Sequence, residues 1–343
     1  MKALRKTRPE RGAELVEIPV PPVGPRDIQV KVKAAAICGS DIHIYGWNAW
    51  AQQRLKLPMT FGHEFCGEVV KVGEQVTHLK PGDLVAAETH IPCGQCYQCR
   101  TGNQHVCEHM SILGVHAEGV FSDYAVIPAV CGWKLPPSTD PELGAVMEPM
   151  GVAVHGLLAE PVDGGSVAII GCGPIGIFGA QVAAALGAYP LFVLDVSPDR
   201  LAMATRIVPQ AVGLNPAKDD VVAAVRKATN GRGIDIAVEL SGSVPGTRLA
   251  FNMTRSGGRV SLVGLTGEPV TLNTCDDIIY KEVTVKGTTG RLMWKTWYQM
   301  DRLLASGRFD PRQVITHRFS LADFNKAFEL ATSATAGKIL LIP

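Results

Sequence analysis

Four cysteines lie close together in one stretch of the chain, with the spacing Cys93-x2-Cys96-x2-Cys99-x7-Cys107. Four thiolates at such spacings can surround one Zn²⁺ tetrahedrally, and four protein ligands leave no position open for water or substrate. We therefore interpret residues 93–107, the cysteine lobe, as a structural zinc site. An iron–sulfur cluster or a set of redox-active thiols remains an alternative for the same four residues.

A second set of candidate metal ligands, Cys38, His63 and Glu64, is spread along the chain, with Glu148 further on. A catalytic zinc keeps about three protein ligands and one open position, and a thiolate, an imidazole and a carboxylate fit that number. Because successive strand residues point to opposite faces, His63 and Glu64 can share one metal only on an irregular turn. A histidine that simply packs in the core is the alternative.

A glycine-rich turn follows the apolar strand candidate 166–171 and opens a helix. It reads Gly171-Cys172-Gly173-Pro174-Ile175-Gly176. In such a turn the first glycine permits the tight bend and the second lets backbone N–H groups approach a pyrophosphate. The third allows close packing of helix on strand, and the helix N-terminus attracts the phosphates. This context favours dinucleotide binding over a turn that serves packing alone.

Asp195 ends the next strand candidate, about 20 residues beyond the turn, where an acidic side chain accepts hydrogen bonds from the adenosine ribose. Its charge favours NAD over NADP, although Arg200 nearby is the residue type that accommodates a 2′-phosphate. Open parallel sheets place ligands at the carboxyl ends of their strands. The remaining candidate cofactor-binding residues follow later strands, and they are Val263, Gly264, Leu265, Thr288 and Thr289.

The first 150 residues carry short β-type runs separated by turn signals, for example 28–37, 66–73 and 83–88, which predicts an antiparallel, barrel-like domain. After Glu160, strand and helix candidates alternate, which is typical of a doubly wound parallel sheet. These candidates are 166–171, 175–188, 191–196, 219–229, 233–242, 257–264 and 282–288.

Beyond Arg291 we expect an amphipathic helix over 294–307, then over 317–334 a turn leading into another helix, and a closing strand over 338–342. The predicted domains are 1–150, an inserted nucleotide-binding domain over 151–290, and a return of 291–343 to the first domain. The net charge is +1 and no block of like charges occurs, so a nucleic-acid or membrane-surface partner is not expected. No apolar export segment or membrane span is evident, and the clustered thiols favour the reducing cytoplasm.

The segments ICGSDIH (37–43) and GHEFCGEVVKVGEQV (62–76) resemble the two signatures of the zinc-containing medium-chain alcohol dehydrogenases. With the cysteine lobe and the glycine turn, the motifs follow the family's order along essentially the whole chain. The resemblance implies an α/β fold with a GroES-like antiparallel β-barrel catalytic domain and a doubly wound Rossmann domain. It also implies one catalytic and one structural zinc, with NAD as hydride acceptor.

The resemblance also implies individual roles. Cys38, His63 and Glu64 would hold the catalytic zinc, and Glu148 would lie beside it as an alternate ligand or proton relay. Ser40 and His43 would pass the alcohol proton towards solvent. The family often carries Thr where this chain has Ser40, which keeps the hydroxyl. It carries Asn where this chain has Val152, which puts a polar role there in doubt.

Four further segments are most similar to family members that oxidise the C3 hydroxyl of L-threonine: 43–50, 148–155, 290–298 and 315–329. The alternative is a polyol or secondary-alcohol dehydrogenase with the same metal and cofactor. The resemblance implies a small amino-acid substrate, a homotetramer and a functional link to a ligase that forms glycine. Trp47, Trp50, Trp294 and Trp297 could line the substrate pocket, although large aromatic side chains more often pack in a core or an interface. His90 and Arg291 are further possible pocket residues, for which loop packing and a surface ion pair, respectively, are equally good explanations.

Overall fold

The computed structural model describes residues 1–333 and 335–343, and the chain forms two compact units. The first unit contains residues 1–149 and 315–343, and the second contains residues 150–314. The chain therefore returns to the first unit at Ile315, later than the predicted return at 291. Helix α9 (Lys295–Ala305) accounts for the difference, because its Met300 packs against Gly151 of the second unit.

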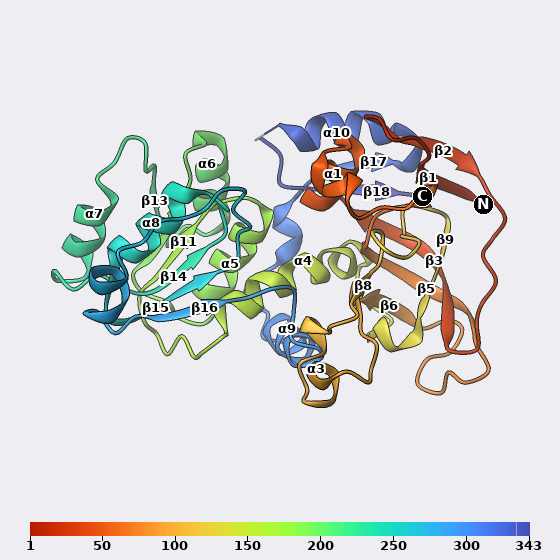
Figure 1. Cartoon of the computed structure of the whole chain (residues 1–343), viewed down its shortest axis with the longest axis horizontal. Coiled ribbons are helices and arrows are strands. Elements are labelled where there is room, and N and C mark those ends of the chain that lie inside the picture. The colour runs from red at the N-terminus through yellow and green to blue at the C-terminus, as the bar shows by residue number, and fades with distance from the viewer. Residues whose placement is uncertain (334) are drawn as a thin grey trace. The chain divides into compact units, whose positions relative to one another are not determined.

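The strands of the first unit pair in antiparallel fashion except β17 and β18, which are parallel (Figure 1). Its main sheet has the strand order β10-β6-β5-β3-β18-β17, with β9 also pairing with β3, and a smaller sheet has the order β2-β1-β4. The strands are β1 (Lys2–Lys6), β2 (Glu14–Glu17), β3 (Asp27–Ala36), β4 (Met59–Thr60), β5 (Glu64–Val72), β6 (Leu84–Ala87), β7 (His90–Ile91), β8 (Ser111–Ile112), β9 (Tyr124–Pro128), β10 (Gly132–Leu135), β17 (Ile315–Ser320) and β18 (Lys338–Ile342).

Alternation along β3 explains this sheet, because Ile28, Val30 and Val32 are buried while the residues between them are not. An aromatic cluster fills the core, in which Phe328 stacks on Tyr45 with ring centroids 4.6 Å apart. The helical segments of this unit are α1 (Gly39–Gly46), α2 (Ala49–Gln52), α3 (Tyr97–Arg100), η1 (Gln104–Val106), η2 (Ala129–Cys131), η5 (Leu321–Asp323) and α10 (Phe324–Thr332). Helix α4 (Pro141–Leu157) contains the boundary between the units.

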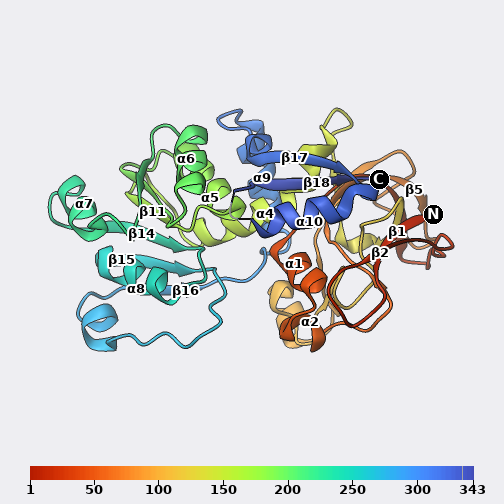
Figure 2. The same ribbon diagram turned by 90° about the horizontal axis from the view of Figure 1, so that it is seen from above.

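The second unit is a six-stranded, all-parallel sheet with the order β13-β12-β11-β14-β15-β16 and helices on both faces (Figures 1 and 2). Strands β11 and β12 are buried throughout, as expected for parallel strands covered on two sides. The elements are β11 (Val167–Ile170), α5 (Pro174–Ala185), β12 (Leu191–Leu194), α6 (Pro198–Ile207), β13 (Val212–Leu214), α7 (Val221–Ala228), β14 (Ile234–Glu239), α8 (Val244–Met253), β15 (Thr254–Leu262), η3 (Cys275–Ile279), β16 (Thr284–Gly287), α9 (Lys295–Ala305) and η4 (Pro311–Val314).

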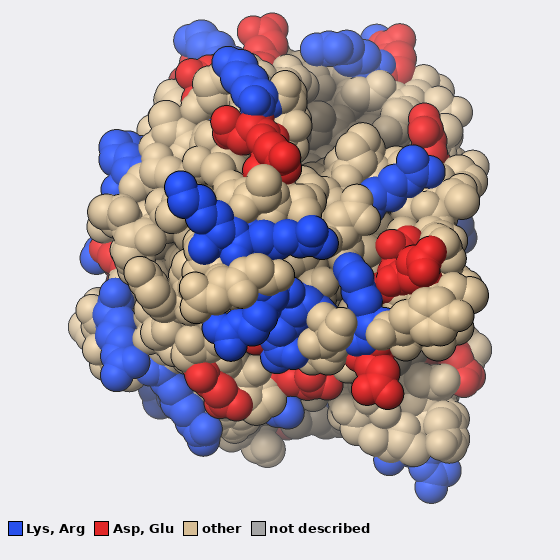
Figure 3. Space-filling view, turned by 90° about the vertical axis from the view of Figure 1, so that its left-hand side faces the viewer, with Lys and Arg blue, Asp and Glu red and all other residues tan. Residues whose placement is uncertain are grey.

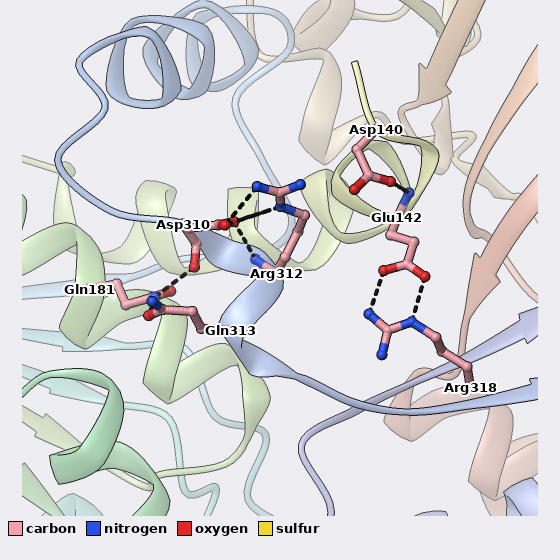
Figure 4. A network of polar contacts seen from close by, with 7 residues as sticks. All are labelled: Asp140, Glu142, Gln181, Asp310, Arg312, Gln313 and Arg318. Carbon is pink, nitrogen blue, oxygen red and sulfur yellow. Dashed lines mark hydrogen bonds and ion pairs between the residues drawn. The ribbon is translucent and has the colours of Figure 1, made fainter. Parts of the chain in front are cut away.

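Polar contacts anchor the last third of the chain within each unit (Figure 4). In the first unit, the Arg318 guanidinium on β17 donates two hydrogen bonds to the Glu142 carboxylate in the first turn of α4, each 2.5 Å long. In the second unit, Gln181 on α5 donates to the Asp310 carbonyl at 3.0 Å and so holds the segment before η4. The C-terminal elements are thus fixed by specific pairs as well as by apolar packing.

The predicted elements differ from the structure in two respects. Residues 317–320, predicted as a turn, belong to strand β17, which pairs with β18 in parallel. Helices α6 and α8 were not predicted, and residue 334 of the last predicted helical segment lies outside the described residues. Local sequence alone does not reveal a short parallel strand whose partner is a distant segment.

The face shown in Figure 3 carries Lys and Arg side chains interspersed with Asp and Glu, so it does not present a field of one sign. Within residues 1–333 and 335–343, no helix combines the length and the apolar character needed to cross a bilayer.

Candidate active site and its two metal clusters

The cysteine lobe brings its four thiols together. One Sγ atom from each of Cys93, Cys96, Cys99 and Cys107 lies within 4.8 Å of the others. Cys96 caps the short helix α3, and Cys99 lies within it. Backbone N–H groups point at the sulfur atoms, and the Cys107 Sγ accepts from Cys93 at 3.3 Å and from His109 at 3.3 Å. This donor set fits one tetrahedral ion.

Other backbone donors favour an anionic sulfur at Cys96. Hydrogen bonds from Cys99 and Glu108 lower the pKa of the Cys96 thiol to about 6. Burial raises the pKa of Cys99 to about 12, with the neighbouring thiols adding to the effect. The four sulfurs therefore cannot all ionise at neutral pH unless a cation shares their charge. This electrostatic demand supports a zinc ion there.

The second cluster brings together the three dispersed residues. Ligand atoms of Cys38, His63 and Glu64 lie within 4.8 Å of one another. Cys38 follows β3 and precedes the first turn of α1. His63 lies just outside β5, after Gly62, whose φ of 88° bends the chain where a Cβ would also meet the Phe121 ring. The irregular turn that sharing one metal requires is therefore present between Gly62 and Glu64.

Negative groups surround His63. The Asp41 carboxylate is fully buried, accepts from the Cys38 N–H at 2.8 Å and lies 3.9 Å from the His63 Nδ1 atom. Burial alone would lower the pKa of His63, but Cys38 and Asp41 raise it to about 10. The surroundings therefore favour a positive charge at this point, and an open-site metal ion would supply one.

Glu64 has a partner that the sequence did not reveal. The Lys338 ammonium on β18 donates to both oxygens of Glu64, at 2.6 and 2.5 Å, and to the Ile37 carbonyl at 3.0 Å. Both side chains are buried. Burial raises the pKa of Glu64, while Glu64 raises the pKa of Lys338 against the effect of burial. The one charged residue in the otherwise apolar segment KILLI was the available signal.

Glu148 and the predicted proton path also lie in the first unit. Glu148 is buried in α4, and its charge raises the pKa of both Glu64 and His63, which places it near the second cluster. The Ser40 hydroxyl is buried and has no hydrogen-bond partner within the described part of the chain. His43 lies one turn further along α1, is exposed, and accepts at Nδ1 from the Asn48 amide at 2.8 Å.

The glycine turn in the second unit fits a dinucleotide. Gly171 has φ 97°, and a Cβ there would lie 2.7 Å from the Ser241 nitrogen. A Cβ on Gly173 would meet nothing within 4 Å, whereas one on Gly176 would lie 1.8 Å from the Gly171 carbonyl oxygen. The first and third glycines thus serve close packing, and the second faces open space beside the N-terminus of α5.

Asp195 follows β12 at the carboxyl edge of the same sheet. Its Oδ2 accepts from the Cys172 N–H at 2.7 Å and its Oδ1 from the Ser197 N–H at 2.8 Å. A carboxylate has about four acceptor positions, so capacity remains for ribose hydroxyls. Arg200 lies in the first turn of α6. Burial and the charge of Asp195 raise the pKa of Cys172, and the charge of Arg200 opposes that rise, so Asp195 and Arg200 both lie near Cys172.

The later cofactor candidates reach the same edge. Val263 and Gly264 donate their N–H groups to the Glu239 carbonyl at 3.0 and 2.9 Å, and Leu265 is exposed. The Thr288 hydroxyl is buried without a hydrogen-bond partner within residues 1–333 and 335–343. An orphaned hydroxyl at the edge where ligands bind fits a polar group of a cofactor.

Other candidates from the sequence have different environments. Trp297 and Arg291 are fully buried in the second unit, so a surface ion pair for Arg291 was the wrong alternative. His90 donates at Nδ1 to the carboxylate of the buried Glu88 at 2.7 Å. Of the cysteines outside the two clusters, Cys66, Cys131 and Cys172 are buried and Cys275 is exposed.

Two sequence families match most of the chain. Residues 24–137 match the family described as alcohol dehydrogenase GroES-like domain, and residues 174–306 match the family described as zinc-binding dehydrogenase. The chain is 45% identical over 343 residues to the L-threonine 3-dehydrogenase of Pyrococcus horikoshii, covering 100% of this chain and 98% of that protein. It is 44% identical over 344 residues to the L-threonine 3-dehydrogenase of Bacillus velezensis, covering 100% and 99%.

Solved structures share the whole architecture. A putative zinc-binding dehydrogenase from Sinorhizobium meliloti 1021 bound to NADP superposes with a TM-score of 0.90 at 30% identity, covering 100% of this chain and 99% of that one. The 2R,3R-butanediol dehydrogenase from Bacillus subtilis gives 0.89 at 30% identity, with the same coverages. A short chain alcohol dehydrogenase from E. coli CFT073 complexed with NADH gives 0.89 at 29% identity, again covering 100% and 99%.

Proposed function

The chain belongs to the zinc-binding dehydrogenase family, and we propose that within this family it oxidises the C3 hydroxyl of L-threonine. The product is 2-amino-3-oxobutanoate, and NAD accepts the hydride. The observation that carries this proposal is the 45% identity to a threonine dehydrogenase over the full chain, against 30% to a butanediol dehydrogenase of similar fold. An oxidoreductase that uses zinc and a nicotinamide dinucleotide follows from the family itself.

Cys38, His63 and Glu64 are the proposed ligands of the catalytic zinc, which supplies Lewis-acid stabilisation to a substrate oxygen that loses its proton. The Asp41 carboxylate lies 3.9 Å from the His63 Nδ1 atom, beyond hydrogen-bonding distance, and its charge favours a cation at this point. Glu148 adds a second carboxylate to this buried environment. The four thiols of the cysteine lobe are the proposed ligands of a structural zinc.

Ser40 and His43 are the proposed carriers of the substrate proton. The Ser40 hydroxyl is buried with no partner within the described residues, so it can accept a proton from one side and donate to another. His43 is exposed one turn away, and histidine is the residue type that most often transfers protons in enzyme active sites. The path thus runs along one face of α1 from a buried hydroxyl to solvent.

The dinucleotide is proposed to lie over Gly173 with its pyrophosphate at the N-terminus of α5, and its adenosine ribose at Asp195. The other proposed contacts are Gly171, Pro174, Ile175, Gly176, Arg200, Val263, Gly264, Leu265, Thr288 and Thr289. Asp195 carries the preference for NAD, because its charge repels a 2′-phosphate.

A substrate panel tests the proposed reaction. NAD reduction is followed with L-threonine, sorbitol and 2,3-butanediol under identical conditions. A site that binds the substrate's ammonium and carboxylate groups should favour L-threonine in kcat/KM by at least about 10²-fold. Turnover of a polyol or butanediol with no turnover of L-threonine would instead establish the second candidate, a secondary-alcohol dehydrogenase.

Replacing the ribose-binding carboxylate tests the cofactor assignment. Asp195→Gly should reduce the preference for NAD over NADP in kcat/KM by roughly 10-fold or more, since it removes a charge-assisted hydrogen bond and a repulsive charge. Asp195→Asn is the matched control, because it keeps an acceptor for the Cys172 N–H while removing the charge. An unchanged cofactor ratio in both variants argues against the role of Asp195.

We propose a homotetramer in the cytoplasm, coupled to a ligase that consumes the product to form glycine. The nine cysteines are all free thiols, which supports a reducing compartment. Light scattering of the purified protein measures the assembly state.

A further inference from the structure

One buried acid in the second unit has no part in the reaction proposed above. Glu239 is the last residue of β14, and its side chain is fully buried at the carboxyl edge of the parallel sheet. A carboxylate buried away from water is costly unless several donors satisfy it. The identity of its donors therefore indicates what this acid is for.

The donors come from the loop that follows β14. The Glu239 Oε1 atom accepts from the Ser241 N–H at 2.8 Å and the Gly242 N–H at 3.1 Å, and it also accepts from the Ser241 hydroxyl. Ser243 caps α8 at the end of this loop. The positive end of that helix favours a negative charge nearby. The carboxylate thus fixes the backbone of residues 240–243.

The fixed loop packs against the glycine turn. A Cβ on Gly171 would lie 2.7 Å from the Ser241 nitrogen and 2.8 Å from the Ser241 Cα atom. Any displacement of Ser241 towards Gly171 would therefore push on the turn that is proposed to hold the pyrophosphate. The hydrogen bonds from Ser241 to Glu239 therefore fix the distance between residues 240–243 and the glycine turn.

The same carboxylate lies against the loop that follows β15. A Cβ on Gly264 would lie 2.6 Å from the Glu239 Oε2 atom and 2.3 Å from the Gly242 nitrogen. A Cβ on Gly242 would lie 2.6 Å from the Leu265 carbonyl oxygen. The two loops are therefore in direct contact, with the Glu239 carboxylate between them.

We propose that Glu239 is a positioning residue for dinucleotide binding: its carboxylate holds three loops, the glycine turn, residues 240–243 and residues 263–265, at the spacing that the cofactor requires. This inference rests on the dinucleotide site proposed above and adds a residue to it. Burial raises the pKa of Glu239, and the donors from Ser241 and Gly242 oppose that rise, so the loop and the charge of the acid depend on each other.

The test compares two acids on the same strand. Asp235 lies near the opposite end of β14 and is bound in a similar way, accepting from the Ser166 N–H at 2.8 Å and from the Ser166 hydroxyl at 2.5 Å. It also receives a hydrogen bond from Arg255. Glu239→Gln and Asp235→Asn therefore remove comparable charges at the two edges of one sheet.

NADH affinity is measured by fluorescence titration of each variant, with zinc content and melting temperature recorded alongside. Glu239→Gln places amide hydrogens against the Ser241 and Gly242 donors, so NADH binding should weaken about 10-fold. Asp235→Asn should lower the melting temperature but leave NADH binding within about 2-fold of the original chain. In turnover, Glu239→Gln should raise the KM for NAD while kcat at saturating NAD changes little.

Ser241→Ala is a milder second variant, which removes one donor to Glu239 and keeps the backbone contacts. It should weaken NADH binding about 3-fold. If Glu239→Gln and Ser241→Ala lower the melting temperature but bind NADH as tightly as the original chain, Glu239 is a structural acid and the inference is overturned. If the original chain does not bind NADH, the proposed dinucleotide site is contradicted, and the inference about Glu239, which rests on that site, is contradicted as well.

Discussion

The first unit contains two clusters of side chains that could hold a metal ion, and they are assembled in opposite ways. The cysteine lobe takes all four thiols from residues 93–107 and adds little except backbone N–H groups. The open cluster takes Cys38, His63 and Glu64 from two separate segments and surrounds them with other charged groups. A closed metal site with four protein ligands can be encoded in one loop. A site with an open coordination position needs surrounding structure that fixes its three ligands in place.

The two clusters also differ in how the negative charge of their side chains is compensated. The thiols of the lobe depend on a cation to ionise together, because burial raises the pKa of Cys99 to about 12. In the open cluster, Lys338 already neutralises Glu64. We infer that the lobe loses its order without its metal, while the framework around the open cluster persists. The following predictions examine that contrast.

The largest effect is expected from Cys38→Ser. It removes one of the three proposed ligands at the open cluster, so one zinc per chain should be lost and kcat should fall by at least about 10³-fold. Since the framework of β3 and β5 remains, the melting temperature should change little. Zinc analysis by mass spectrometry, turnover and calorimetry measure the three quantities. Retention of both zinc ions with full turnover contradicts the assignment of the open cluster.

Cys96→Ser should have the converse pattern. Loss of the structural ion should lower the melting temperature by roughly 10 °C, the equivalent of about 3 kcal/mol in a unit of this size. Turnover at low temperature should stay within about 3-fold of the original chain. Limited proteolysis should now cleave between residues 93 and 107. If this variant keeps its stability and instead loses all turnover at low temperature, the two clusters have been assigned to the wrong roles.

Lys338→Met tests whether Lys338 compensates the charge of Glu64 at the open cluster. It leaves the buried Glu64 carboxylate without its cation, and breaking such a pair costs about 3 kcal/mol or more. Zinc binding should restore part of this loss, because the metal then supplies positive charge in place of the missing Lys338 ammonium. The stabilisation by added zinc should therefore be larger in Lys338→Met than in the original chain.

The matched control for that variant is Lys326→Met. Lys326 forms an exposed ion pair with Asp323, with a nitrogen to oxygen distance of 2.9 Å, and exposed pairs contribute little. Thermal melts of the metal-free and zinc-loaded forms supply the measurement. Equal zinc stabilisation in all three proteins would mean that Lys338 and the metal do not share Glu64.

The sequence was sufficient to predict the sites whose residues lie close together along the chain. The spacing of the four cysteines and the context of the turn at Gly171 each lie within a short segment, and the structure brings each set together. The order of alternating strands and helices in the second unit could be predicted for the same reason. The requirement for an irregular chain at His63 also came from sequence reasoning about strand geometry.

Apart from the open cluster, whose ligand set the family resemblance supplied, the contacts between distant parts of the chain were not predicted. The pairing of Lys338 with Glu64 joins residues 274 positions apart, and only the folded sheet puts β18 beside β3. The buried state of Asp41 and the strand character of residues 317–320 depend on the same tertiary packing. Single-sequence reasoning fails there because burial, not residue type, decides the role of an ionisable side chain.

The smallest effect is expected at Lys6, whose side chain connects strand β1 to helix α1, the helix that follows Cys38. Its buried ammonium on β1 donates to the Gly12 carbonyl at 2.8 Å and to the Tyr45 carbonyl on α1 at 3.4 Å. Burial lowers the pKa of Lys6 from 10.5 to about 8. Between these values the unfolded chain binds more protons than the folded chain, so this residue makes stability rise as pH increases from about 8 to 10.5.

Lys6→Met should abolish that rise, which urea denaturation at several pH values between 8 and 10 measures as the difference between variant and original chain. Because Tyr45 belongs to the helix that follows Cys38, the variant should slightly weaken zinc retention at the open cluster and leave the cysteine lobe unchanged. A loss of zinc from the lobe instead would show that the two clusters are coupled through the framework, and the contrast between a self-contained loop and a supported site would not hold.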